Sequence, residues 1–478
     1  MRLLELIMEL ESMETNADLD TDITGVYNDS RLVEPGGLFV AVSGSEHDGH
    51  IYIPKALQQG AAVVVTEKPL THAVPYVVVP DTKEALGRLN SAFFSHPSRE
   101  MTMVGVTGTS GKTTVTHLLY ALLAKMPGAV PALIGTNHIL FAGRETPSHH
   151  TTPDAVQLHS LLREMADEGC THCVMEVSSH SLEQKRVAGI HFHTAVFTNL
   201  SHEHLDYHKN MENYFRSKAL LFEQCTHGYV NSDDLYGKRL KDTYSLGDYA
   251  VDSAAQMKAE NVVSAPGGVD FTVCFEGQKT HMRWGTPGLF TVYNILAATR
   301  AASGLGIPPE EAATIIEGIP PVCGRMEKVA NPAGIDIIID YAHKPDALEK
   351  VLSALRPLAV GRLITVFGCG GDRDREKRPK MGAIAENLSD TVIVTSDNPR
   401  AEDPVKIIAD ITAGMPGGGH ITVPDRREAI FTALGMAKPG DMVALCGKGH
   451  EMYQEIHGAR YPMDEREIVA AYWRNEDA

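Results

Sequence analysis

The sequence predicts an α/β fold of three domains, and three observations lead to that prediction. The chain has 478 residues, which is room for about three domains at roughly 150 residues each. Short apolar runs with strand character alternate with helical patterns along most of the chain, as in parallel βαβ units. One of these runs leads directly into a glycine-rich turn and then a helical pattern, an order typical of nucleotide-binding α/β domains.

Composition narrows the class of protein further. The 43 Lys and Arg are outnumbered by 61 Asp and Glu, giving a formal net charge of −18, which argues against general binding to nucleic acid or an anionic membrane. No apolar run reaches the roughly 18 residues of a membrane span, and the start of the chain reads as an amphipathic helix rather than a signal peptide. The 7 Cys are scattered, so we expect a cytoplasmic protein without a disulfide framework.

Residues 1–97 are predicted to form a small α/β domain. Its strand-like runs are Leu38–Val42, Ala62–Thr66 and Tyr76–Val79. A linker is expected at His96-Pro97, because proline disfavours helix at the residue before it. The second domain is predicted over residues 98–327, beginning with the apolar strand Met101–Val106.

The third domain is predicted over residues 328–478. It contains strand-like runs at Ile335–Asp340, Leu363–Phe367, Thr391–Thr395 and Met442–Cys446. Helical patterns lie between these runs, so a mostly parallel sheet is expected.

The glycine-rich turn follows the strand that opens the second domain. Glycines let backbone N–H groups surround phosphate oxygens, Lys112 supplies positive charge, and the Thr113 hydroxyl is suited to ligate Mg²⁺. The general phosphate-loop pattern has its first glycine at the place of Val106, so this loop is a variant; the alternative is an ordinary glycine turn with an exposed lysine. The residues predicted to bind ATP here are Gly108, Thr109, Ser110, Gly111, Lys112, Thr113 and Thr114.

Further segments follow one another along the whole chain in a recognisable order. They are Asp29-Ser30-Arg31 with Pro35–Ala41, Thr151-Thr152-Pro153, Met175–His180, Asn199-Leu200 with His204-Leu205-Asp206, Tyr214–Phe222, Gly324–Glu327, Asp340–His343, Gly368–Arg373 and Gly447–Glu451. Together with the glycine loop, these segments resemble the Mur ligases of bacterial cell-wall synthesis. The resemblance implies a first domain that binds a uridine nucleotide, a central phosphate-loop ATPase-like domain with a parallel sheet, and a Rossmann-like last domain that holds an incoming amino acid.

The resemblance also implies a metal site. Its ligands would be Thr113, Glu176, His204 and Lys218, the lysine being converted by CO₂ into a carbamate (N6-carboxylysine) that holds Mg²⁺, with two Mg²⁺ ions expected. From the residues alone, Lys218 is only a helical lysine and Glu176 a possible surface acid at a strand end. The spacing of His202 and His204 leaves zinc as an alternative.

Other residues match the family's substrate positions. The muramoyl dipeptide would contact Thr151, Thr152, Ser178, Gln184 and Arg186, and Arg186 offers a fork for an anion. The uridine nucleotide end would contact Ser30, Ser45, Glu46 and His47. Further ATP contacts would come from Asn294, Arg325 and Asp340, although Asn294 alone reads as a solvent-facing helical residue.

The segment Asp397-Asn398-Pro399-Arg400 follows a predicted strand, at the place where α/β domains bind ligands. By itself it could be a plain Asn-Pro turn. In the resembled family it implies meso-diaminopimelate as the added amino acid, since an arginine fork can pair with the distal carboxylate and Asp397 can accept from the amine. The same ligand would contact Arg373, Gly447 and Glu451.

The resemblance therefore implies an ADP-forming ligase that joins meso-diaminopimelate to UDP-N-acetylmuramoyl-L-alanyl-D-glutamate through an acyl phosphate. We expect a monomer that binds no nucleic acid and no membrane. The alternatives are a phosphate-loop kinase or NTPase, a folylpolyglutamate synthetase, a ligase that adds D-alanyl-D-alanine, and a binding protein with a decayed site.

Overall fold

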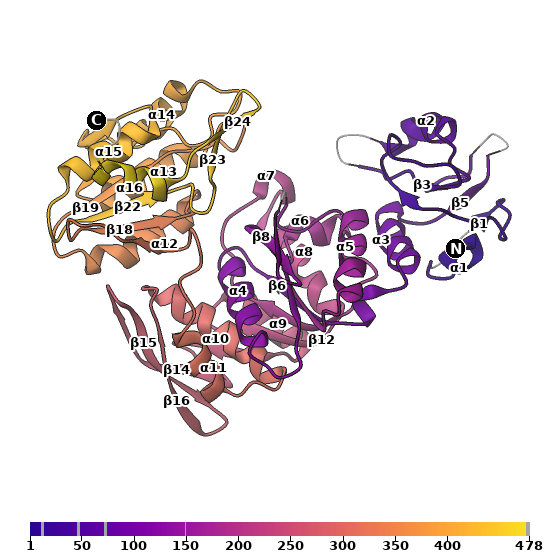
Figure 1. Cartoon of the computed structure of the whole chain (residues 1–478), viewed down its shortest axis with the longest axis horizontal. Helices are drawn as coiled ribbons and strands as arrows, with labels where there is room; N and C mark the ends of the chain where they lie inside the picture. Colours follow the sequence, from indigo (N-terminus) through magenta and orange to yellow (C-terminus); the bar gives the residue numbers. More distant parts are fainter. Residues whose placement is uncertain (11–13, 45–47, 71–73, 149, 475–478) are drawn as a thin grey trace. The chain divides into compact units, whose positions relative to one another are not determined.

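The computed structural model describes residues 1–10, 14–44, 48–70, 74–148 and 150–474. The chain divides into two compact units, each built on α/β layers (Figure 1). The first unit comprises residues 1–200, 208–249 and 297–307, and the second comprises residues 201–207, 250–296 and 308–478. No helix of the described residues is both long and apolar enough to cross a bilayer.

The first unit begins with a five-stranded sheet. Its strands, in pairing order, are β1 (Glu14–Thr15), β5 (Tyr76–Val78), β4 (Val63–Thr66), β3 (Leu38–Val40) and β2 (Val26–Tyr27). All but the edge strand β1 are parallel. Helices α1 (Leu3–Ile7) and α3 (Thr82–Phe93) pack on one face, and α2 (Ile53–Gln58) packs on the other. The three predicted strands are confirmed, each one or two residues shorter than expected.

The remainder of the first unit surrounds a larger sheet. Its strands, in pairing order, are β13 (Gly247–Ala250), β12 (Cys225–Asn231), β11 (Phe192–Phe197), β6 (Thr102–Thr107), β10 (His172–Glu176), β7 (Pro131–Ile134), β8 (His138–Phe141) and β9 (Arg144–Pro147). The strands from β13 to β7 are parallel, and β8 and β9 form an antiparallel edge. Because β6 lies between β11 and β10, the carboxyl ends of these three strands bring the glycine loop, Asn199 and Glu176 to one edge of the sheet.

Helices connect these strands and begin at residues suited to capping. They are α4 (Lys112–Leu123), α5 (Ala155–Asp167), α6 (Ser179–Glu183), α8 (Met211–Glu223) and α9 (Leu235–Tyr244). Asp154 accepts the backbone N–H of Gln157 and Asn210 accepts that of Asn213, so side-chain oxygens satisfy backbone donors at the first turns of α5 and α8. Two further helices, α7 (Leu205–His208) and α10 (Leu289–Gly304), contribute residues to both units.

The second unit contains an antiparallel meander that the sequence analysis did not predict. It is formed by β14 (Met257–Ala265), β15 (Gly268–Phe275) and β16 (Gln278–Trp284). Trp284 is buried and its indole N–H donates to Ile319 O at 2.8 Å, just beyond helix α11 (Pro309–Glu317). Alternate residues of β16 are buried, as expected for a strand whose sheet has one buried face and one solvent-exposed face.

The rest of the second unit is a six-stranded sheet. In pairing order it contains β17 (Glu327–Val329), β18 (Asp336–Asp340), β22 (Met442–Cys446), β19 (Leu363–Phe367), β20 (Thr391–Val394) and β21 (His420–Thr422). All but β17 are parallel. One face is covered by α12 (Pro345–Leu355), α13 (Lys377–Leu388) and α14 (Pro404–Thr412), and the other by α15 (Arg426–Met436) and α16 (Glu465–Arg474). The four predicted strands are confirmed.

Candidate active site

The glycine loop connects β6 to α4 and has the shape that its sequence predicts. Gly108 and Gly111 have φ of +145° and +89°, which residues with a Cβ rarely adopt. A Cβ on Gly108 would lie 1.9 Å from Thr198 Oγ1, so glycine is required there. The Lys112 ammonium donates to Gly108 O at 2.9 Å and to Thr109 O at 3.1 Å, which holds its charge over the loop.

Asn199, which follows β11, fixes the conformation of this loop. Its side-chain oxygen accepts from Ser110 N at 3.1 Å, its amide donates to Ser110 O at 3.0 Å, and its backbone oxygen accepts from Thr109 N at 2.8 Å. Asn199 belongs to one of the segments that carry the family resemblance, but no function was predicted for it. Its signal was its place directly after a buried strand that neighbours β6.

Glu176 ends β10 and is buried, with 1% of its surface exposed. Its Oε1 accepts from Thr113 Oγ1 at 3.0 Å and from Thr136 N at 2.8 Å, and its Oε2 accepts from Thr136 Oγ1 at 3.0 Å. A Cβ on Gly135 would lie 2.9 Å from Glu176 Oε1, so the backbone approaches the carboxylate closely. The surface-acid alternative is wrong, and two of the predicted metal ligands lie in direct contact.

The residues predicted for the muramoyl dipeptide gather around this carboxylate. Thr151 Oγ1 lies 3.1 Å from Thr136 Oγ1, and Thr152 Oγ1 donates to Glu176 O at 2.9 Å. The other members are joined to Thr152 or to one another: Ser178 N donates to Thr152 Oγ1, and Arg186 donates to Thr152 O and Gln184 Oε1.

Lys218 lies in α8 and is 1% exposed, so it is not the surface lysine that its sequence allowed. Its Nζ donates to Gly108 O at 2.8 Å, the same oxygen that accepts from Lys112. Burial, and then the charge of Lys112, lowers the pKa of Lys218 well below its ordinary value. The residues 108–114, Glu176 and Lys218 are called the loop site below.

Of the predicted nucleotide-end contacts, the structure describes Ser30, which lies in the turn between β2 and β3. Ser30 is buried, whereas Ser45, Glu46 and His47 lie outside the described residues. In the same sheet region, Glu67, which follows β4, accepts from Ser43 Oγ at 3.0 Å and from Thr82 Oγ1 at 2.8 Å.

In the second unit, a group of polar side chains lies at the carboxyl ends of β20 and β22. We call Asp397, Asn398, Lys448 and Glu451 the Asp397 cluster. The buried Lys448 ammonium donates to Asn398 Oδ1 at 2.8 Å and to Glu451 Oε2 at 2.6 Å, and Asn398 Nδ2 donates to that same oxygen at 2.9 Å. Burial alone would raise the pKa of Asp397, but Lys448 and Arg426 hold it below its ordinary value. Asp397 Oδ2 is buried and accepts no hydrogen bond from the described residues.

The remaining residues predicted for the amino acid lie beside this cluster. A Cβ on Gly447 would lie 2.6 Å from Asp397 Oδ2, so glycine is required there. Arg400 has a φ of +51°, donates to Gly371 O at 2.9 Å and lies 3.3 Å from Glu455 Oε2. Arg373 is exposed and donates to the carbonyl of Asp372. Pro399 is buried between Asn398 and Arg400.

The other predicted ATP contacts are also held in place. Asp340 is buried and accepts from Met326 N at 2.8 Å, while the Arg325 guanidinium lies 4.8 Å from the ring centre of Tyr341. Burial raises the pKa of Asp340, with Arg325 opposing that shift. Asn294 is buried in α10, so its solvent-facing alternative is wrong.

His204 has a φ of +55° and its Nε2 lies 2.6 Å from Glu203 Oε1, which also contacts Lys344. Among the described residues, no three His, Cys, Asp or Glu side chains form a metal-binding group. The participation of His204 in a metal site stays a prediction.

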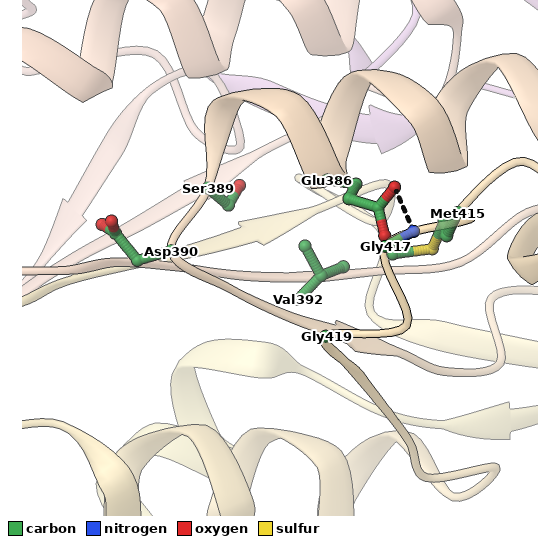
Figure 2. A pocket seen from close by; sticks show the side chains of 7 residues that line it. All are labelled: Glu386, Ser389, Asp390, Val392, Met415, Gly417 and Gly419. Atoms are coloured by element: carbon green, nitrogen blue, oxygen red, sulfur yellow. Dashed lines mark hydrogen bonds between the residues drawn. The ribbon is translucent and has the colours of Figure 1, made fainter.

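A separate pocket of about 160 Å³ lies in the six-stranded sheet region (Figure 2). It is lined by Glu386, Ser389, Asp390, Val392, Met415, Gly417 and Gly419. These residues lie at the amino end of β20, opposite to the end that carries Asp397, and none was predicted to bind a ligand.

The glycine loop, the buried Glu176 and the hydroxyl and guanidinium groups around it define a multidomain phosphate-loop protein of the α/β class. Sequence models of three Mur ligase domains match the chain: the family's catalytic domain over residues 22–94, the middle domain over residues 106–302 and the glutamate ligase domain over residues 324–449.

The chain is also similar to curated relatives over nearly its full length. It is 45% identical over 476 residues to UDP-N-acetylmuramoyl-L-alanyl-D-glutamate--2,6-diaminopimelate ligase of Gloeobacter violaceus, covering 98% of this chain and 97% of that one. It is 42% identical over 458 residues to the ligase of the same name from Clostridium botulinum, covering 94% of each. A solved structure with that name aligns at a TM-score of 0.73 and 32% identity, over 100% of this chain and 99% of the other. The chain therefore belongs to the Mur ligase family, and the predicted family and fold class are confirmed.

Proposed function

We propose that this chain joins meso-diaminopimelate to UDP-N-acetylmuramoyl-L-alanyl-D-glutamate and releases ADP and phosphate. One observation carries the proposal: a continuous hydrogen-bonded path runs from Thr113 through Glu176 and Thr136 to Thr151. This path joins the phosphate loop to side chains suited to hold a second substrate. A phosphoryl group and its acceptor would therefore meet at Glu176, as an acyl-phosphate ligase requires.

In the proposed reaction, an oxygen of the D-glutamate side-chain carboxylate attacks the γ-phosphorus of ATP, and the bond to the β-phosphate oxygen breaks. Lys112 balances the charge on the transferring group, while Arg186 orients the substrate carboxylates. The neutral amine of the amino acid then attacks the acyl carbon, and phosphate leaves with the bonding electron pair and takes up the proton that the nitrogen loses. The side chains act by positioning anionic reactants and excluding water.

The residues at the loop site fit Mg²⁺. Thr113 Oγ1 and Glu176 Oε1 lie 3.0 Å apart, and both are hard oxygen donors. Mg²⁺ bound there would supply charge neutralisation to the phosphate oxygens. His204 is the further proposed ligand, for a second ion.

We assign Lys218 as the carbamylated residue. A neutral amine is needed to attack CO₂, and the lowered pKa of Lys218 favours that form. Carbamylation would also replace the repulsion between two neighbouring ammonium groups with attraction to Lys112. The carbamate N–H would retain the hydrogen bond to Gly108 O that Nζ makes at 2.8 Å.

The amino acid is assigned to the Asp397 cluster. Asp397 Oδ2 and Glu451 can accept from an ammonium group, and Arg400 can pair with a second carboxylate. Lysine lacks that carboxylate, so it would leave Arg400 without this ligand contact.

The three domains are assigned accordingly. Residues 1–97 bind the uridine nucleotide end, residues 98–327 bind ATP, and residues 328–478 bind the amino acid. The protein is proposed to act as a cytoplasmic monomer.

The decisive experiment measures ADP release by the purified chain with ATP, Mg²⁺ and UDP-N-acetylmuramoyl-L-alanyl-D-glutamate, with either meso-diaminopimelate or L-lysine. Turnover that requires the nucleotide dipeptide and diaminopimelate is the expected result. A preference for lysine would overturn the role of Arg400. Turnover independent of any amino acid would overturn the ligase assignment in favour of an NTPase.

A further inference from the structure

Lys185 lies between two side chains proposed to hold the substrate, and its backbone conformation is unusual for a lysine. It has a φ of +54° directly after α6. Arg186 N donates to Ser181 O at 2.8 Å and Lys185 N donates to Leu182 O at 3.1 Å, the pattern in which helices usually place glycine at this position. A Cβ is disfavoured there, so the backbone alone does not explain the lysine.

The side chain of Lys185 reaches the first domain. Its Nζ lies 2.5 Å from Glu84 Oε2 and 3.3 Å from Asp81 Oδ2. Both acids lie at the amino end of α3, where Asp81 also accepts from two backbone N–H groups. All three side chains are half-buried, and the hydrogen bond from Lys185 holds the pKa of Glu84 below its ordinary value.

The same end of α3 also contacts residues that follow strands β3 and β4. Thr82, the first residue of α3, donates to Glu67 through both its backbone N and its Oγ1. Glu67 in turn accepts from Ser43 at 3.0 Å. Ser43 precedes the Ser45–His47 segment by two residues in the sequence. The amino end of α3 therefore contacts the turn that carries Gln184 and Arg186 and, through Glu67, the residues that follow β3 and β4.

The backbones also approach closely here, so the contact has a defined geometry. A Cβ on Gly87 of α3 would lie 2.7 Å from Ala188 O, and Ser91 Oγ donates to Gly189 O at 3.1 Å. Residues 184–189 thus rest directly on α3. A single ion pair at one end of such a contact can fix the rotation of the turn that carries Gln184 and Arg186.

We propose that Lys185 is a positioning residue. Its ion pair with Glu84 and Asp81 fixes the position of the turn that carries Gln184 and Arg186 relative to helix α3 of the first domain. The two ends of the anionic substrate are then held at a fixed separation. This inference rests on the proposed function, because it needs a substrate with a nucleotide at one end and a carboxylate at the other.

The test uses Lys185→Gly in the full chain. Glycine suits the φ of this position, so the melting temperature should stay within error of wild type. The KM for UDP-N-acetylmuramoyl-L-alanyl-D-glutamate should rise about fivefold, the effect of losing one half-buried ion pair, while the KM for ATP and for diaminopimelate stay unchanged. Lys185→Arg should restore the wild-type KM. Ser245→Gly is the matched control, since Ser245 is an exposed residue with a φ of +54° at the end of α9.

A second variant removes the partner. Glu84→Gln should raise the same KM, and the Lys185→Gly, Glu84→Gln double variant should be no worse than the poorer single variant. An unchanged KM in Lys185→Gly, or fully additive single effects, would overturn the positioning role. An inactive wild-type chain would instead overturn the proposed function, so the two failures are distinguishable.

Discussion

The loop site and the Asp397 cluster occupy equivalent places, the carboxyl ends of parallel strands, but their charges are arranged in opposite ways. In the loop site, the Lys112 ammonium donates to the carbonyls of Gly108 and Thr109, so its charge lies over the glycine loop. In the Asp397 cluster, Lys448 is already paired with Glu451, and a buried oxygen of Asp397 accepts no hydrogen bond from the described residues. The first arrangement suits a phosphate and the second suits an ammonium group. The fold thus brings polar side chains to the same kind of place in both sites, and the pairing of charges distinguishes the ligands that we propose for them.

The sharpest test of this comparison replaces the buried lysine of the loop site. Lys218→Met keeps most of the buried volume but removes the amine, and we expect kcat to fall about a thousandfold, as for other losses of transition-state charge stabilisation. Mass spectrometry without acid treatment should detect the carbamate in wild type and not in the variant. The exposed Lys238→Met serves as the control. Turnover close to wild type in Lys218→Met would contradict the assignment.

The next test concerns the Asp397 cluster. Arg400→Met removes the fork proposed to bind the distal carboxylate, and kcat/KM for meso-diaminopimelate should fall about a hundredfold. The low activity expected with L-lysine should stay unchanged, because lysine never engages Arg400. Arg356→Met, at the other end of the sheet, controls for the loss of an arginine. Equal losses with both amino acids would show that Arg400 serves the fold rather than the choice of substrate.

The sequence predicted these two sites unequally, and the reason is physical. The glycine loop lies in one continuous segment between a strand and a helix, so local patterns were sufficient. The Asp397 cluster joins residues of two segments, and its Lys448 was not predicted because a buried lysine has no local signature. Thr136 and Asn199 were missed likewise, since their contacts depend on the order β11-β6-β10-β7 in the sheet. The meander β14–β16 was missed because its strands mix apolar and polar residues, whereas the strands that were predicted are continuous apolar runs.

The loops at the two sites are fixed by different interactions, which predicts different responses to acid. Neutral hydrogen bonds from Asn199 hold the glycine loop. The loop of residues 370–372, which follows β19 in the second unit, is held by charged groups instead. The buried Arg378 donates to Gly370 O and to Glu402, and Glu402 also accepts from Asp372 N. Hydrogen bonding to Arg378, above all, lowers the pKa of Glu402 from 4.5 to about 2. A lowered pKa stabilises the folded chain above pH 4.5, and this contribution is lost as the pH falls toward 2.

Glu402→Gln should therefore lower the free energy of unfolding by about 2 kcal/mol at pH 7. This is less than the full cost of leaving the buried Arg378 guanidinium unpaired, because glutamine keeps one oxygen that can accept a hydrogen bond from it. The difference from wild type should shrink progressively below pH 4.5. Denaturant unfolding at several pH values measures it, and the exposed Glu349→Gln provides the control. A difference independent of pH would mean that packing, not charge, explains the loss.

A smaller expected effect separates the side-chain and backbone hydrogen bonds that Thr136 donates to Glu176. Thr136→Val removes the hydroxyl that donates to Glu176 Oε2 and contacts Thr151, but keeps the backbone N–H that donates to Oε1. One carboxylate oxygen then loses its donor while the other stays fixed, so kcat should fall about tenfold, the cost of one hydrogen bond to a charged group. The KM for ATP should not change, because the glycine loop is held by Asn199 instead.

Thr194→Val, a buried β11 residue away from Glu176, is the matched control. A rise in the KM for ATP would instead mean that changes at Thr136 and Glu176 alter the glycine loop. The hydrogen bond between Thr113 and Glu176 would then be the contact that couples them.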